Sequence, residues 1–342
     1  MRRFFTACLF LLGGSSPLFA QFDYPSWPSV YRIYYADSVS NTISTAVVSL
    51  DPVNDSLNIS ANRILYAAGN PAGIVACGED LYWIERTSGA VYRGRKDGST
   101  SKSLIVSGIG GLARDLVLRG GALYISYVYR NGQWGIVKAD LSGNIVQQFL
   151  AGGYEPTGME KAAMNLLVST TGGIHSINFN TGSTTLLTSV QSYDITVVDT
   201  SLVYTVSSGG QIYLFKRSLG GGGAASLLGS WGLTGAGHMD SVDNHVFLGL
   251  TGGYQSWLGV VGVRENVGSR GSIQVGRLLF SIGLNGLVVE RLNQVKNDFD
   301  GDGLADRSVY YPATGQWYVC GTATGFYTDQ FGYPGTIPVP GD

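Results

Sequence analysis

Short apolar runs separated by turn residues recur along most of the chain, and they predict strands rather than helices. The clearest unit covers residues 73–108, GIVACGEDLYWIERTSGAVYRGRKDGSTSKSLIVSG. Four short strand-like segments lie at 74–77, 81–85, 91–95 and 103–107, and the intervening GED, TSG and KDGS stretches are typical of tight turns. The unit therefore predicts four short antiparallel strands.

The same pattern repeats along the chain, with one central apolar residue in the second strand of each unit. Neighbouring copies of this residue lie 36 to 48 residues apart. That spacing is typical of the four-stranded blades of a β-propeller, so we expect an all-β protein with six blades. The helix-like run EPTGMEKAAMNLL at 155–167 falls on strands in this register. The central residues are Ile33, Leu81, Leu123, Leu166, Leu202 and Val246.

Five of the six units carry their own first strand, but the first unit does not. The residues before it, YPSWPSVY, contain Pro25 and Pro28, which suit an inner strand poorly. The missing strand is predicted at the other end of the repeats, where GLVVERLN at 286–293 matches GIVACGED at 73–80 in residue type. We expect this C-terminal segment to close the ring, because closure leaves few exposed strand edges. The predicted propeller domain then spans residues 21–293.

Two of the units resemble the YWTD-type six-bladed propeller of lipoprotein-receptor ectodomains. LYWIERTSGAVYRGRKDGS at 81–99 is the closest stretch, and YYAD at 34–37 is a second. The corresponding strands of the other units read YISY, LVST, VYTV and FLGL and lack the motif. The resemblance covers residues 29–293 and implies the six-bladed fold. It does not imply receptor-type ligand binding, because a shared fold does not establish a shared function.

Polar side chains cluster at the predicted beginnings of the inner strands, which line the central channel of a propeller. Side chains alternate in direction along a strand, so two positions of each inner strand should face this channel. At those positions we expect Asp115, Glu160, Asp194, His238 and Asp240 to converge at one mouth. Such a cluster could bind a cation or a sugar or perform acid–base chemistry; the alternative is that polar residues simply line a wet channel. The second channel-facing positions are Val75, Val117, Glu160, Thr196, Asp240 and Val288.

An acidic loop follows the predicted propeller, in a chain with only 13% charged residues. From residue 298 it reads D-F-D-G-D-G-L-A-D, with carboxylates at positions one, three, five and nine and a glycine at six, where a calcium loop turns sharply. The first six positions match an EF-hand loop, but position twelve is Val309 rather than glutamate. RSVYYPATGQWYV at 307–319 predicts a β-hairpin with PATG at its turn rather than a helix. The alternative is a solvated acidic turn that holds no metal.

This segment resembles the calcium loop of FG-GAP or VCBS-type repeats. The resemblance implies a single repeat at residues 294–342 that Ca²⁺ stabilises. A single unit of this kind cannot bury its own apolar face, so we expect it to pack on the propeller or on a partner. The resemblance also implies the ligands, which are the side chains of Asp298, Asp300, Asp302 and Asp306 and the backbone carbonyl of Leu304.

The N-terminal residues 1–20 predict a secretory signal peptide. Arg2 and Arg3 form a basic region, residues 4–12 are apolar, and Ala20 is a small residue at a plausible cleavage point. The apolar run is too short to span a membrane, and no other segment is long and apolar enough to do so. We therefore expect a secreted protein, either extracellular, at the cell surface or in the periplasm. Cleavage changes the net charge from −2 to −4, which gives no indication of nucleic-acid binding.

The sequence carries no catalytic motif. There is no G-x-S-x-G elbow, no Walker loop and no histidine or cysteine spacing typical of zinc. Cys77 and Cys320 could pair in an oxidising compartment, although Cys77 suits the role of a small apolar strand residue. We therefore predict a secreted binding or scaffold protein with an unknown protein or carbohydrate partner. The alternative is an extracellular polysaccharide-active hydrolase or lyase at the channel mouth, which depends only on the acidic cluster.

Overall fold

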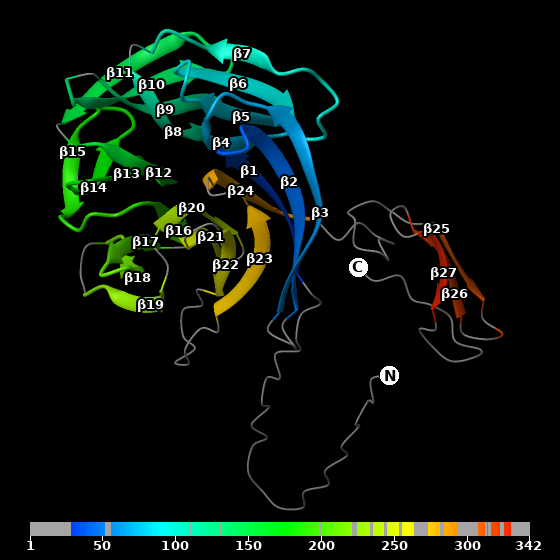
Figure 1. Ribbon diagram of the computed structural model, residues 1–342. Coiled ribbons are helices and arrows are strands. Elements are labelled where there is room, and N and C mark those ends of the chain that lie inside the picture. The colour runs from blue at the N-terminus through cyan, green and yellow to red at the C-terminus, as the bar shows by residue number, and fades with distance from the viewer. Residues whose placement is uncertain are drawn as a thin grey trace, which may run out of the picture.

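The described strands form a ring of antiparallel sheets around a central axis in this computed structural model (Figure 1). Among the described residues there are no helices, and therefore none long and apolar enough to cross a membrane. The structure describes residues 29–51, 56–109, 111–129, 131–152, 154–198, 200–220, 224–232, 235–242, 245–252, 255–262, 273–280, 284–292, 307–311, 313, 316–321 and 325–329.

Six of the sheets have four strands, and each runs from an inner strand at the axis to an outer strand. The inner strands are β24 (Leu284–Arg291), β4 (Pro71–Cys77), β8 (Leu112–Arg119), β12 (Pro156–Ala162), β16 (Ile195–Val198) and β20 (Gly235–Val242). The second strands are β1 (Ser29–Asp37), β5 (Asp80–Glu85), β9 (Ala122–Val128), β13 (Asn165–Thr170), β17 (Ser201–Ser208) and β21 (His245–Gly252).

The third and fourth strands of each sheet complete an antiparallel meander away from the axis. The third strands are β2 (Thr42–Asp51), β6 (Ala90–Arg95), β10 (Trp134–Asp140), β14 (Gly173–Asn178), β18 (Gln211–Ser218) and β22 (Gln255–Gly262). The fourth strands are β3 (Ser56–Ala67), β7 (Ser103–Val106), β11 (Ile145–Gly152), β15 (Thr184–Thr188), β19 (Ser226–Trp231) and β23 (Ile273–Phe280).

The inner strands contact one another in a closed cycle. In order around the axis, β24 contacts β4, then β8, β12, β16 and β20 follow, and β20 contacts β24 again. An all-β propeller is therefore the observed architecture, as the repeat spacing predicts. The helix-like run at 155–167 lies on β12 and β13, so the repeat register was the better guide than local propensity.

The predicted closure of the ring by a C-terminal strand is confirmed. β24 pairs with β1 in an antiparallel register that places Val288 opposite Tyr34. The Leu292 amide continues the pairing by donating to the Val30 carbonyl at 3.0 Å. Lys96, from the neighbouring sheet, pairs with Glu290 on β24 and also lies over the Tyr34 ring. Strand hydrogen bonds and an ion pair between sheets thus hold the two ends of the ring together.

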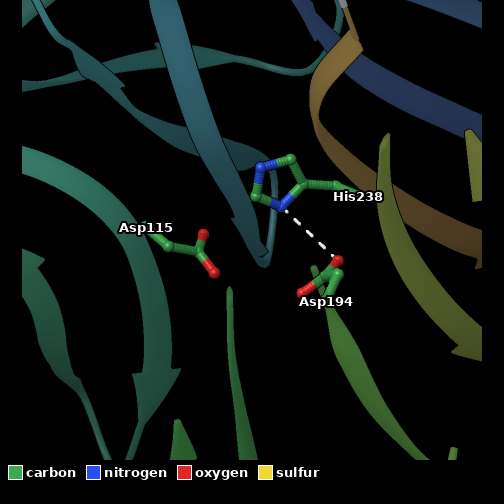
Figure 2. Close-up of side chains that lie close together, drawn as sticks. All are labelled: Asp115, Asp194 and His238. Carbon is green, nitrogen blue, oxygen red and sulfur yellow. Dashed lines mark ion pairs between the residues drawn. The ribbon is translucent and has the colours of Figure 1, made fainter. Parts of the chain in front are cut away.

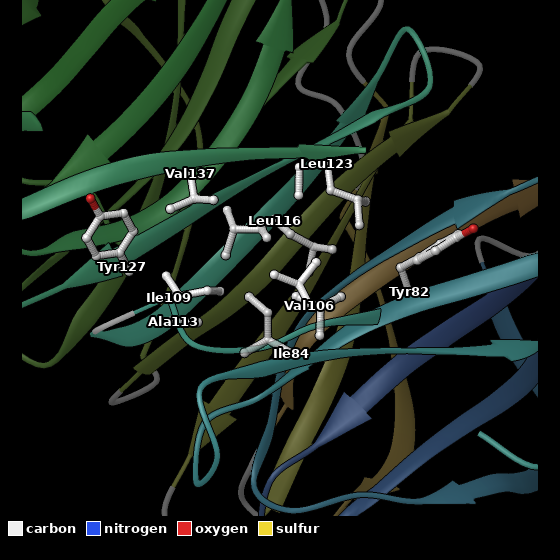
Figure 3. Packing of buried hydrophobic residues seen from close by; sticks show 12 residues of the cluster. Tyr82, Ile84, Val106, Ile109, Ala113, Leu116, Leu123, Tyr127 and Val137 are labelled. Carbon is white, nitrogen blue, oxygen red and sulfur yellow. The ribbon is translucent and has the colours of Figure 1, made fainter. Parts of the chain in front are cut away.

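Apolar side chains fill the spaces between neighbouring sheets. The central residues identified in the repeats all lie in second strands, and each is at most 1% exposed. Figure 3 shows one such core, where Ile84 and Val106 of one sheet meet Leu116, Leu123 and Val137 of the next. Period-two alternation explains this arrangement, because it directs one face of each sheet toward its neighbour.

The chain after β24 forms a separate three-stranded sheet of β25 (Arg307–Tyr311), β26 (Gln316–Gly321) and β27 (Gly325–Asp329). β25 and β26 form the predicted hairpin, with Tyr311 opposite Gln316 at its turn. Cys77 has a free thiol. The side chain of Cys320 lies outside the described residues, as do the predicted signal peptide and the acidic loop.

We expect Leu287→Ala on β24 to lower the free energy of unfolding by about 2–4 kcal/mol, because Leu287 is 5% exposed and packs in the core beside Tyr35 and Phe247. The matched control is Val39→Ala in an exposed turn, where a change within about 0.5 kcal/mol is expected. Equilibrium denaturation measures both. Equal effects would mean that β24 is not an integral part of the ring.

Candidate functional site

A cavity of about 450 Å³ occupies the centre of the ring, and all six inner strands contribute to its lining. The five residues predicted to converge there all line it. Thr196, also predicted to face the channel, does not, because its buried hydroxyl donates to Ser241 Oγ at 2.9 Å and Val197 lines the cavity instead. The lining residues predicted from the sequence are Asp115, Glu160, Asp194, His238 and Asp240.

Asp115 joins two neighbouring inner strands through its carboxylate. It belongs to β8, where Oδ1 accepts a hydrogen bond from the Leu116 amide at 2.8 Å. Oδ2 accepts another, also at 2.8 Å, from the amide of Met159 on β12. Both oxygens of this buried side chain are thereby engaged with backbone donors, which are favourable partners for a charged carboxylate.

Asp194 and Asp240 repeat this arrangement further round the ring. Asp194 accepts from its neighbour Ile195 at 2.9 Å and from the Met239 amide of β20 at 2.5 Å. Asp240 accepts from the next amide in its own strand at 2.8 Å and from the Val289 amide of β24 at 2.6 Å. Three carboxylates therefore connect successive inner strands, a structural role that residue type alone did not predict.

The inner strands are irregular at the level of these carboxylates. The register of pairing with the second strand shifts in β4, β8, β12 and β20, close to the carboxylates. Bulges of this kind change the direction in which side chains point. Gly73 and Gly158 leave the carboxylates room, since a Cβ at either would lie 2.6 Å from Asp115 Oδ1 or 1.8 Å from Asp194 Oδ1. Glycine at those two positions is therefore required by close approach.

Buried hydroxyl groups on the second strands satisfy the backbone at the same level. Ser126 Oγ accepts from the Asp115 amide at 3.1 Å, and Thr205 Oγ1 accepts from the Asp194 amide at 3.3 Å. Ser169 donates to the Gly158 carbonyl at 3.1 Å. Each hydroxyl lies three residues after the central apolar residue of its unit. That spacing is a sequence signal that the initial interpretation missed.

Asp115 on β8, His238 on β20 and Asp194 immediately before β16 meet in the cavity (Figure 2). One ligand atom from each lies within 4.8 Å of the others, and His238 Nδ1 is 3.5 Å from Asp194 Oδ2. Burial alone would lower the pKa of His238, but the nearby charges of Asp194 and Asp115 raise it. Burial, and then the charge of Asp194, raises the pKa of Asp115 to about 6, while His238 opposes this shift. Among the described residues, these three could share a metal ion.

Glu160 and Asp240 form a second acidic pair in the cavity. Burial, together with the charge of Asp240, raises the pKa of Glu160 to about 8. Burial also raises the pKa of Asp240 to about 6, and its two amide donors oppose the shift. Glu160 accepts only from the Lys161 amide, at 2.7 Å, and makes no bridge to another inner strand that the structure describes. Its carboxyl group is therefore the less constrained of the two.

Three basic residues near the channel were missed by the sequence interpretation. Lys161 lines the cavity beside Glu160. Arg86 directly follows β5, and Arg114 lies at the bulge of β8, immediately before Asp115. Lys161 and Arg114 could have been found from the sequence, because each is next to an acidic residue that was predicted to face the channel. No sequence signal indicated Arg86. The expected calcium ligands Asp298, Asp300, Asp302, Leu304 and Asp306 lie outside the described residues.

No protein-family model and no curated protein sequence matches the chain. A chain of the nidogen/laminin complex aligns with a TM-score of 0.57 at 10% identity, covering 76% of this chain and 98% of that chain. TolB from Acinetobacter baumannii aligns with a TM-score of 0.56 at 12% identity, covering 76% of this chain and 66% of that chain. A Bacteroides caccae protein of unknown function aligns with a TM-score of 0.51 at 11% identity, covering 77% of this chain and 100% of that chain.

These similarities support the fold alone, because the identities are low. They agree with the closed cycle of inner strands in assigning the chain to the β-propeller class. The site that the fold defines is a polar axial cavity whose carboxylates bridge its walls.

The free energy of unfolding is expected to fall from about pH 5 to about pH 8, by on the order of 5 kcal/mol. The folded protein raises the pKa values of Asp115, Asp240, Glu160 and His238. Over this range it therefore holds more protons than the unfolded chain, and a rise in pH removes that stability. Urea unfolding as a function of pH measures the effect. Glu160→Gln should flatten the curve above about pH 6, and a rise in stability toward pH 8 would contradict the assignment.

Proposed function

We propose that the protein is a binding or scaffold module that recognises its partner at the mouth of the axial channel where the inner strands begin. The observation that carries this proposal is that the buried carboxylates already accept hydrogen bonds from the backbone. Asp115 and Asp194 are 6% and 2% exposed, and both oxygens of each accept backbone hydrogen bonds. A catalytic acid or base must instead reach a substrate proton.

A protein is the first candidate partner, and a carbohydrate is the other. One of the similar structures is a nidogen/laminin complex, which supports a protein partner for a propeller of this shape. The concave mouth, with polar side chains around it, is the kind of surface on which propellers and other ring-shaped folds can seat a protruding group. A nucleic-acid partner is not expected, because the net charge of the chain is −2.

The finer architecture is part of the same proposal. Six four-stranded sheets and the cyclic contacts of their inner strands support a count of six blades. Residues 1–20 would be a signal peptide, 21–293 the propeller and 294–342 a calcium-binding repeat, in a protein that is secreted.

A photo-crosslinking amino acid at Tyr154 should capture a discrete partner from the medium in which the protein is found. Tyr154 is 54% exposed and lies two residues before β12, beside the mouth. The matched control is the same substitution at Leu104, which is also 54% exposed but lies on the outer strand β7. Mass spectrometry identifies the adducts. Crosslinks only at position 104, or equally at both positions, would argue against a site at the mouth.

The alternative function is an extracellular polysaccharide-active hydrolase or lyase. Glu160 and Asp240 support it, because two carboxyl groups with raised and different pKa values can act as acid and base. A panel of neutral and acidic polysaccharides, assayed for reducing ends and for unsaturated products, tests this idea. Activity that Glu160→Gln removes would favour the enzyme, and a complete lack of turnover in the parent protein would exclude it.

Calcium binding at the acidic loop is proposed from the ligand spacing. EDTA should lower the melting temperature of the C-terminal sheet, and Asp300→Ala should abolish the difference between the EDTA and Ca²⁺ samples. The matched control is Ala313→Ser, at an exposed position between β25 and β26 and outside the acidic loop, which should keep the calcium response. Calorimetry that detects no heat of binding at millimolar Ca²⁺ would refute the proposal.

A further inference from the structure

Two arginine side chains lie together beside the channel mouth. Arg86 follows β5, and its amide donates to the carbonyl of Asn70, immediately before β4. Arg114 lies at the bulge of β8, an inner strand that β5 contacts. The charges of Arg114 and Asp115 act on Arg86, and the charge of Arg86 acts on His238, so these groups lie at the same end of the ring.

The Arg86 guanidinium has no hydrogen-bond or ion-pair partner among the described residues. Its Nε atom is buried without an acceptor, and the same is true of Arg114 Nε. Burial, and then the charge of Arg114, lowers the pKa of Arg86. A buried, unsatisfied donor on a charged group is destabilising. Packing therefore holds Arg86 in place, and no hydrogen bond within the described structure accounts for its charge.

Two other arginines, Arg93 and Arg114, differ from Arg86 in having acidic partners. Arg93 lies 2.8 Å from Asp80, and Arg114 forms an ion pair with Glu155. Some of the N–H donors of the Arg114 guanidinium are therefore unused, and in the described structure all of the side-chain donors of Arg86 are unused. A guanidinium group presents several N–H donors in a plane, and a carboxylate matches them with two parallel hydrogen bonds.

The charges around the two arginines limit the kind of anion that can bind. Asp115 and Glu155 act on Arg86, and Asp194 lies next to His238. These carboxylates repel any anion, and the repulsion is largest for a densely charged polymer or a doubly charged phosphate. A ligand with a single carboxylate is repelled least, and it is attracted by two guanidinium groups and by a histidine whose pKa is raised. The same positive charges disfavour a divalent cation at Asp115, Asp194 and His238.

We propose that Arg86 and Arg114 bind a single carboxylate, presented by an acidic side chain of a protein partner at the channel mouth. This inference rests on the proposed binding function and names the group that is recognised. The carboxylate accepts from the guanidinium group of Arg86, with Arg114 as the second donor. Binding brings an anion to the arginine that lacks one within the described structure, and small side-chain shifts of this kind are common when partners bind.

The test is an NMR titration of the arginine Nε–Hε signals with the capped peptide acetyl-Gly-Asp-Gly-amide at constant ionic strength. We expect saturable shifts of the Arg86 and Arg114 signals with a millimolar dissociation constant, and none with acetyl-Gly-Asn-Gly-amide. Arg86→Gln and Arg114→Gln should each weaken binding about tenfold or more. Arg93→Gln, which removes an arginine that already has a partner, should leave the affinity unchanged.

A stability measurement separates a binding role from a structural one. Because Arg86 makes no side-chain hydrogen bond in the described structure, Arg86→Gln should leave the melting temperature unchanged or raise it by on the order of 2 °C. A clear fall would assign Arg86 to the stability of the fold and overturn the inference. An absence of shifts with the aspartate peptide, or tighter binding of inorganic phosphate or polygalacturonate, would also overturn it. Crosslinking at Tyr154 in the presence of such a negative result would retain the binding function and reject only the carboxylate.

Discussion

Carboxylates that accept backbone hydrogen bonds from the next inner strand around the axis are the interaction on which the rest of this structure depends. Asp115, Asp194 and Asp240 each take one amide from their own strand and one from the next inner strand. Inner strands of neighbouring sheets belong to different hydrogen-bonded ladders. The carboxylates thus provide direct polar links between sheets that otherwise meet mainly through apolar packing.

This arrangement also determines what the centre of the ring can do. The carboxylates are buried because they hold the walls together, and the raised pKa values of Asp115 and Asp240 follow from that burial rather than from tuning for proton transfer. Among the described residues of this site, Glu160 within the cavity and Arg86 and Arg114 beside the mouth keep unused hydrogen-bonding capacity. Structural and recognition roles are therefore divided between neighbouring residues of the same site.

Much of the fold could be predicted from the sequence because it is built from local, repeated signals. The spacing of residues such as Leu81 and Leu123 identified the second strands, and the match at residues 286–293 identified the closing strand. The links made by Asp115, Asp194 and Asp240 span 44, 45 and 49 residues, so no local pattern indicates their partners. Strict alternation of side chains also failed for Thr196. It predicted that Thr196 faces the channel, whereas its side chain donates to Ser241 and does not line the cavity.

The most direct test of these links is hydrogen exchange of the Met159 and Met239 amides in an Asp194→Ala variant. The Met239 amide donates to Asp194, whereas the Met159 amide donates to Asp115 and serves as the internal reference. Loss of protection at Met239 with retention at Met159 is the predicted result, and Asp115→Ala should produce the reverse. Unchanged protection of Met239 without Asp194 would contradict the claim that these carboxylates join the inner strands.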